Sequence, residues 1–211
     1  TGFSAIPSQK LLKFCGFAQN FNNIPNFSFE TTTSCTPGPG GNFQYIVDWY
    51  NPTQGSPDLY ALCGDIAIPN LIYDIKRHSG INRVGMIVYD SAHINENVRE
   101  YVANKLSETL KAGQRYCFSL YVIPAQGFKY GTDKFGVYFG TGTQSYNVGY
   151  GYIPVTPQIS LPTGVFINDT ANWYNFKGIY TASGGESDIV IGSFSDDVST
   201  NLSLINITGT I

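Results

Sequence analysis

REYVANKLSETLKAGQRYCFSLYVIPAQGFKYGTDKFGVYF, residues Arg99–Phe139, is the stretch of this chain that decides its fold. Within it, Arg115–Ile123 alternates strictly between two sides of the backbone. One side carries Tyr116, Phe118, Leu120 and Val122, and the other carries Cys117, Ser119, Tyr121 and Ile123. A period of two with aromatic and β-branched residues predicts a β-strand. Because both sides are bulky, we expect a strand buried on both faces in the middle of a sheet.

The segment before this strand allows two interpretations. Val98, Val102, Leu106 and Leu110 recur every four residues, which suits one face of a helix and also the even positions of a strand. Residues 111–114 (KAGQ) predict a turn in which glycine takes a positive φ. We favour strand–turn–strand, because an extended element follows directly, and helix stays as the alternative.

Composition limits the class of protein. The chain has 211 residues, 13% of them charged, with 23 glycines and 15 tyrosines. This composition is typical of a secreted β-sandwich and unlike that of a cytosolic helical enzyme. A net charge of −3 argues against nucleic acid as a partner, since few phosphates would be neutralised. No apolar run approaches the roughly 20 residues that span a bilayer, so we expect no membrane span.

The rest of the chain predicts short strands separated by turns. We expect them at residues 22–30, 45–50, 83–90, 158–159, 165–168, 173–182, 187–194 and 201–211, with loops at 31–41, 54–70 and 140–157. Residues 173–182 and 187–194 predict a hairpin around SGGE. The pattern favours an all-β fold, an antiparallel jelly-roll β-sandwich of about eight to ten strands. We assign residues 21–211 to this single domain.

Residues 1–20 precede the sandwich as an apolar arm. The simpler interpretation is an ordered strand that lies on its own domain. The other is a strand exchanged with a neighbouring copy, because an added strand satisfies an open sheet edge.

Four cysteines indicate an oxidising compartment, and we predict a secreted, cell-surface location. We favour a Cys35–Cys63 disulfide, because both residues lie in Gly/Pro-rich loops that a cross-link would hold. Cys117 is expected in mid-strand, either as a buried free thiol or paired with Cys15.

Several segments together resemble one domain family. They are NNIPNFSFE (22–30), DWYNPTQGSPDLYALC (48–63), REYVANKLSETLKAGQRYCFSLYV (99–122) and WYNFKGIYTASGGESDIVIGSF (173–194). In order and spacing they resemble the N-terminal β-sandwich domains of secreted or outer-membrane-associated Bacteroidota proteins. Those domains are similar to the galactose-binding-like jelly rolls of carbohydrate-binding modules. The resemblance covers about residues 22–197 and implies the fold and the compartment more strongly than the function.

The resemblance also implies a structural Ca²⁺. In related carbohydrate-binding jelly rolls the glutamate at the position of Glu30 helps to bind calcium, a cation that prefers oxygen ligands. The family's usual aspartate partner near the C-terminus has no match here. We expect Asp196 or Asp197 to replace it, with a solvated carboxylate at Glu30 as the alternative.

Tyrosines are the candidate ligand-binding residues, because an aromatic face with a polar edge suits a sugar ring. Those in or beside the two long loops, at about residues 50–75 and 140–157, are Tyr50, Tyr60, Tyr73, Tyr146, Tyr150 and Tyr152. For any single one of them, ordinary packing on the sandwich is the alternative. We expect Trp49 and Trp173 to lie in the core.

Catalytic patterns are sparse. His78 and His93 have no metalloprotease or serine-hydrolase motif around them. Acidic residues that could serve a glycosidase by type alone are Asp58, Asp65, Asp133 and Glu186, and no spacing singles out a pair. We therefore predict no enzyme.

The function predicted from the sequence is a non-catalytic carbohydrate-binding or adhesion domain of a secreted, surface-associated bacterial protein, with a glycan or polysaccharide as its partner. The alternative is a structural subunit of an extracellular filament or surface assembly, joined by exchange of residues 1–20. Two departures from the family pattern motivate it: the arm itself and the closing segment NLSLINITGTI, which lacks the family's aromatic ending.

Overall fold

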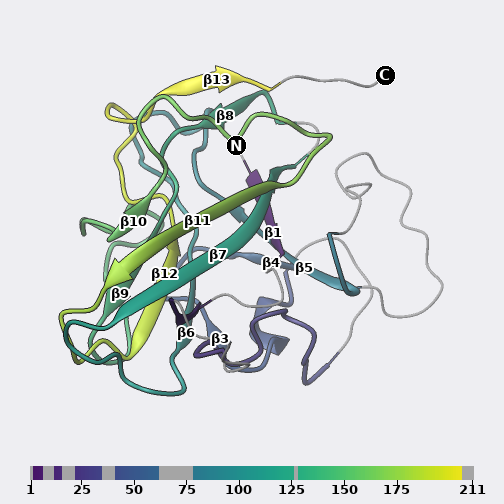
Figure 1. Ribbon diagram of the computed structural model, residues 1–211. Helices are drawn as coiled ribbons and strands as arrows, with labels where there is room; N and C mark the ends of the chain where they lie inside the picture. The colour runs from purple at the N-terminus through teal and green to yellow at the C-terminus, as the bar shows by residue number, and fades with distance from the viewer. Residues whose placement is uncertain are drawn as a thin grey trace.

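A computed structural model describes residues 2–6, 12–15, 22–34, 41–61, 78–125 and 128–205. These residues form an all-β, antiparallel fold with one short 3-10 helix, η1 (Phe43–Tyr45) (Figure 1). The strands are β1 (Gly2–Ile6), β2 (Leu12–Phe14), β3 (Trp49–Tyr50), β4 (Asp58–Ala61), β5 (Asn82–Ile87), β6 (Val102–Lys105), β7 (Arg115–Pro124), β8 (Tyr130–Thr132), β9 (Gly136–Gly140), β10 (Ile159–Ser160), β11 (Tyr174–Thr181), β12 (Asp188–Gly192) and β13 (Leu202–Leu204).

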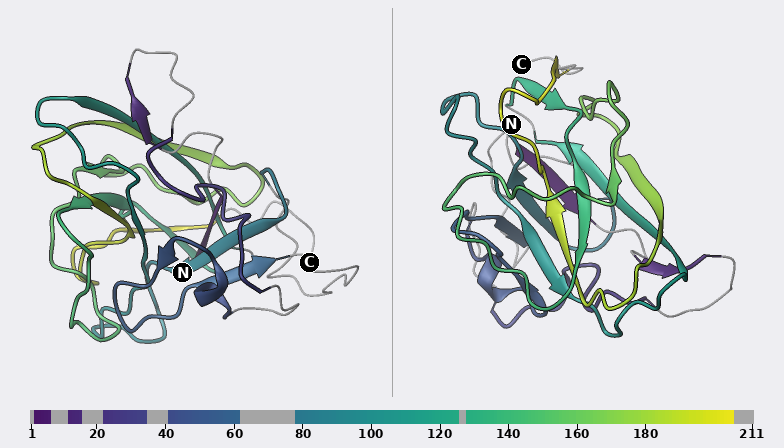
Figure 2. Two further views of the ribbon diagram at one scale, coloured as in Figure 1. Left: turned by 90° about the horizontal axis from the view of Figure 1, so that it is seen from below. Right: turned by 90° about the vertical axis from the view of Figure 1, so that its left-hand side faces the viewer.

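Two large sheets face each other with the core between them (Figure 2). The first sheet has the order β11-β7-β1-β5-β4, and β2 also pairs with β7. The second has the order β10-β9-β12-β6-β3, and a separate small sheet joins β13 to β8. This confirms the predicted antiparallel sandwich, whereas its jelly-roll path stays a prediction.

Strand β7 supplies the first sheet's side of the core. Its even-numbered side chains, Tyr116, Phe118, Leu120 and Val122, are all buried. Across the core, the ring of Phe118 meets that of Phe139 in the second sheet at 6.5 Å between centroids. Such edge-to-face pairs add to the hydrophobic free energy that holds two sheets together.

The opposite face of β7 is only half-buried at Cys117, Ser119 and Tyr121. The prediction of a strand in the middle of a sheet is confirmed, because β11 lies on one edge of β7 and β1 and β2 on the other. The prediction that both faces are buried is confirmed on this side at Ile123 and is wrong at Cys117, Ser119 and Tyr121. A half-buried face tolerates bulky residues, so their presence does not require a second covering layer.

The choice of strand over helix before the turn is confirmed at β6. Gly113 has φ 74° in the turn that follows, as predicted. However, β6 belongs to the second sheet and β7 to the first, so the turn carries the chain from one sheet to the other.

The predicted hairpin between β11 and β12 is wrong for the same reason. Each strand exists, but β11 pairs with β7 and β12 lies between β9 and β6. All five residues of β12 are buried, whereas the residues of β11 that point away from the core are exposed. Ile189 and Ile191 of β12 pack in the main core, and Val190 packs on the other side in the small cluster with Tyr101 and Ile153. β12 is therefore covered on both faces, whereas the outer face of the first sheet at β11 is exposed.

Other local predictions also need correction. The strand expected at residues 22–30 is not formed, and residues 25–28 are a turn. The side chain of Asn26 bonds both the N–H and the carbonyl of Thr31, and Phe29 has φ 60°. Of the strand expected at residues 45–50, the part at Trp49–Tyr50 forms β3, whereas residues 45, 47 and 48 lie in 3-10 helix and turn. Residues 165–168 form no strand. The expected loop at 54–70 contains β4.

The N-terminal arm completes the first sheet. β1 pairs with β5 on one side and with β7 on the other, and β2 continues along the same edge of β7. A disulfide joins Cys15 to Cys117, which decides between the alternatives left open for Cys117. Cys35 and Cys63 lie outside the described residues, so their predicted bond stays a prediction.

Candidate functional site

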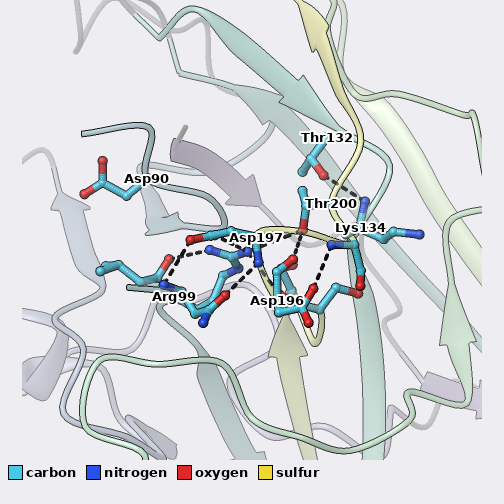
Figure 3. Close-up of polar contacts among 12 residues, drawn as sticks. Asp90, Arg99, Thr132, Lys134, Asp196, Asp197 and Thr200 are labelled. Atoms are coloured by element: carbon cyan, nitrogen blue, oxygen red, sulfur yellow. Dashed lines mark hydrogen bonds and ion pairs between the residues drawn. The ribbon is translucent and has the colours of Figure 1, made fainter. Parts of the chain in front are cut away.

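Arg99 forms a buried ion pair where several loops meet (Figure 3). Its Nη2 lies 2.8 Å from Oδ1 of Asp197, and the two side chains are 0% and 4% exposed. The guanidinium also donates to the carbonyls of Val98 and Ser195 and lies over the ring of Tyr89. A buried guanidinium requires such a counter-charge and acceptors, so this pair fixes the loops that supply them.

Asp197 joins the loop before Arg99 to the loop after β12. Its Oδ2 accepts the N–H groups of Asn95 at 2.9 Å and Asn97 at 3.0 Å. Its own N–H donates to Oδ1 of Asn97 at 2.7 Å. The neighbouring Asp196 accepts the N–H of Ser199 and closes the following turn. These contacts hold residues 95–97 and 196–199 together, and we call this part of the molecule the loop end.

Large apolar side chains are exposed beside this network. Ile94 precedes Asn95, and Val198 follows Asp197; they are 59% and 89% exposed. Tyr150, 60% exposed, accepts the backbone N–H of Arg99 through its carbonyl. Of the predicted ligand-binding tyrosines that the structure describes, Tyr150 is the one with an exposed ring.

Tyr50 and Tyr146 are brought together, but their hydroxyls are already engaged. Tyr50 donates to Asp188 at 2.7 Å and accepts the N–H of Gln144, whose side-chain carbonyl accepts the hydroxyl proton of Tyr146. Burial raises the pKa of Tyr146 to about 12, and burial together with the hydrogen bond to Asp188 raises the pKa of Tyr50. Both rings pack on the small buried cluster around Tyr101 and belong to the sandwich's packing.

Tyr60 lies on β4, in the other large sheet from Tyr50. Its hydroxyl donates to Asp58, and the guanidinium of Arg83 lies 5.2 Å from its ring centre. Tyr73 lies outside the described residues. The described members of the predicted set therefore do not form one surface, and their role in binding stays a prediction.

The predicted calcium ligands have separate partners. Oε1 of Glu30 accepts the N–H groups of Ile81 and Asn82, whereas Asp197 faces the Arg99 guanidinium. A cation beside Asp197 would be repelled by that guanidinium. Within the described ranges, no three acidic, histidine or cysteine side chains form a group that would hold a metal ion. These contacts do not favour the predicted site, which stays a prediction.

The described acidic candidates for glycosidase chemistry each accept hydrogen bonds from neighbouring groups. Glu186 accepts the hydroxyl proton of Tyr180 and the N–H groups of Ser183 and Gly184. Asp133 accepts from Gly164 and Asn201, and Asp58 from Gly41 and Tyr60; Asp65 lies outside the described residues.

An aromatic group missed by sequence reasoning lies on the outer face of the first sheet. The ring of His78 stacks on that of Tyr121 at 3.7 Å between centroids, and Trp173 meets His78 edge-on at 5.9 Å. His78 is exposed, and the two other rings are half-buried. We call these three residues the outer aromatic group.

Polar residues border the outer aromatic group. Asn175 of β11 is paired with Tyr121 of β7, and Lys177 is paired with Ser119, so these side chains share the outer face. Asn175 and Lys177 are both exposed. Trp173 packs beside the small cluster of Ile123 and Ala125, so its predicted place in the main core is wrong, whereas Trp49 is buried there as predicted. Alternation indicated the side of Tyr121, but only the fold brings His78 to it.

Comparison with protein families, characterised proteins and solved structures gives no match for this chain. None of the residues that the structure describes belongs to a helix with the length and hydrophobicity needed to cross a bilayer.

Proposed function

We propose that this chain is a non-catalytic carbohydrate-binding or adhesion domain of a secreted, surface-associated bacterial protein of the Bacteroidota type. The observation that carries the proposal is the outer aromatic group, His78, Tyr121 and Trp173, on a half-exposed sheet face. Its site differs from the tyrosine loops expected from the sequence.

The chemistry of this face fits a polysaccharide. Aromatic rings provide a flat apolar surface for the C–H face of a pyranose ring. The amide of Asn175 and the ammonium of Lys177 lie on the same face and supply hydrogen-bond donors for hydroxyl groups at the ring's edge. An extended sheet face suits a chain of sugars better than it suits a small compact ligand, which needs a concave pocket.

A glycan array followed by titration of the strongest polysaccharide tests this proposal. We expect Trp173→Ala to weaken binding at least tenfold, or about 1.4 kcal/mol, and Trp173→Phe to restore part of it. Ile179→Ala is the matched control, because Ile179 is exposed further along β11.

Tyr150→Ala separates this surface from the loop site predicted from the sequence. If only Tyr150→Ala weakens glycan binding, the glycan binds at the loop end and not on the outer aromatic group. No binding to any glycan would overturn the proposed function.

A structural Ca²⁺ is part of the proposal only through the family resemblance. If calcium is bound at Glu30, EDTA will lower the melting temperature of the wild type and leave that of Glu30→Gln unchanged. Equal melting with EDTA and with added Ca²⁺ would rule out a stabilising calcium.

A second candidate is a structural subunit of an extracellular filament or surface assembly. The position of β1 favours it, because among the strands that the structure describes β1 is the one that joins β7 to β5 in the first sheet. Size-exclusion chromatography with electron microscopy tests it, and a purely monomeric chain would exclude it.

A further inference from the structure

We propose that neighbouring copies of this chain exchange residues 2–15 and that the Cys15–Cys117 disulfide then joins one subunit covalently to the next. The inference rests on the second candidate function and specifies its partner as another copy of the same chain. It also assigns Cys15 and Cys117 as the cross-linking pair.

The first step of the argument is the opening that the arm fills. β1 pairs antiparallel with both β5 and β7, from Ala5 opposite Val84 to Phe3 opposite Pro124. β2 then covers β7 from Phe118 to Tyr116. Without these two strands, the first sheet would separate into β11-β7 and β5-β4, each with an unpaired edge. Unpaired edges readily accept an extended strand.

The second step is that the arm's described contacts do not depend on which copy supplies it. They are backbone pairs with β5 and β7, the bond from the N–H of Cys15 to the carbonyl of Arg115, and the disulfide. An arm from a neighbouring copy would reproduce every one of them. Exchange of an identical element is for this reason a low-cost route to assembly.

The disulfide adds permanence to the exchange. Cys15 and Cys117 are separated by 102 residues within one chain and have Cα atoms 5.2 Å apart in the folded sheet. When the arm of one copy pairs with β7 of another, the two thiols lose two protons and two electrons to a small-molecule disulfide, which leaves as two thiols. The product is a covalent bond between subunits.

Refolding of mixed isotopic chains tests the inference with the unaltered protein. Equal amounts of ¹⁴N and ¹⁵N chains are reduced, unfolded together and refolded with reduced and oxidised glutathione. The sample is quenched in acid and digested without reduction. Mass spectrometry then measures the peptide pair that contains Cys15 and Cys117.

Complete exchange gives light–heavy pairs in half of these peptides, whereas an arm kept in its own sheet gives only light–light and heavy–heavy pairs, which would overturn the inference. Chains refolded separately and mixed afterwards are the control and must give no mixed pairs.

The two proposals fail in different ways. Filaments without mixed peptide pairs would keep the assembly role and remove the cross-link. A monomer by chromatography together with unmixed peptides would remove both.

Discussion

Arg99 and Asp197 form a buried ion pair that holds the loop end together. Both side chains are almost fully buried, and Asp197 also holds the backbone of the loop at Asn95 and Asn97. Removing one charge leaves the other buried without compensation, which costs far more than an exposed ion pair contributes.

We therefore expect Asp197→Asn to lower the free energy of unfolding by about 3–5 kcal/mol, measured by urea denaturation. Arg99→Met added to this variant should recover part of the loss, since neither charge is then buried alone. Arg115→Ala, at an exposed position on β7, should change stability by less than about 0.5 kcal/mol. If Asp197→Asn and Arg115→Ala lower the free energy of unfolding by similar amounts, the ion pair is not the cause of the loss.

Glu100, next to Arg99, is a buried acidic residue, and burial disfavours the charged form of its carboxyl group. Its carboxylate accepts the N–H groups of Ser56 and Ile87, yet burial raises the pKa of Glu100 overall. The folded chain thus binds this proton more tightly than the unfolded chain does. Its contribution to stability is full below the ordinary pKa of glutamate and declines as pH rises through the raised pKa.

Glu100→Gln removes this titration. Whatever its constant effect on stability, we expect the variant to gain relative to the wild type between pH 4 and pH 8. Parallel stability curves for the two proteins over this range would contradict the raised pKa.

Among the elements, the N-terminal arm is held in place by strand pairing with β5 and β7 and by a disulfide. β1 and β2 contribute two short strands, and the Cys15–Cys117 bond ties them to the long strand β7. A disulfide that closes a long loop stabilises chiefly by restricting the unfolded chain.

Replacing both cysteines, as Cys15→Ala with Cys117→Ala, should therefore lower the free energy of unfolding by about 2–5 kcal/mol. Hydrogen exchange should show faster exchange of the β1 amides in this variant, while the pairing between β7 and β11 stays protected. Lys177→Ala, an exposed change on β11, is the control. Unchanged β1 protection would mean that backbone pairing alone retains the arm.

For the whole molecule, acid is the expected route of unfolding. The pKa lies below its ordinary value for the carboxyl groups of Asp90, Asp133, Asp169, Glu186 and Asp196. At Glu186, burial alone would raise the pKa, but hydrogen bonds from Tyr180, Ser183 and Gly184 outweigh it. The stabilisation is present above the ordinary carboxyl pKa of about 4 and is lost as pH falls through the lowered values.

We expect the free energy of unfolding to fall steadily from pH 5 to pH 2, measured by urea denaturation at each pH. Glu186→Gln should flatten part of this decline, because it removes one of the titrating groups. A stability that stays constant to pH 2 would contradict these lowered pKa values.

The sequence by itself determined the local geometry of its most regular parts. Alternation at residues 115–123 predicted β7 and divided its side chains between two faces, since a strand's side chains must alternate. The structure then showed that the even-numbered face meets the core. Lys111–Gln114 predicted the turn, because only Gly113 adopts its positive φ without steric cost. Low charge and dense Gly and Pro punctuation predicted the all-β class.

The tertiary structure alone decided which elements meet. Alternation states the side on which a residue lies but not its partner strand, so β11 and β12 were expected in one hairpin and lie in opposite sheets. For the same reason the sequence did not predict the Arg99–Asp197 ion pair or the contact of His78 with Tyr121. These contacts join residues far apart in the chain, and burial of a shared core brings them together.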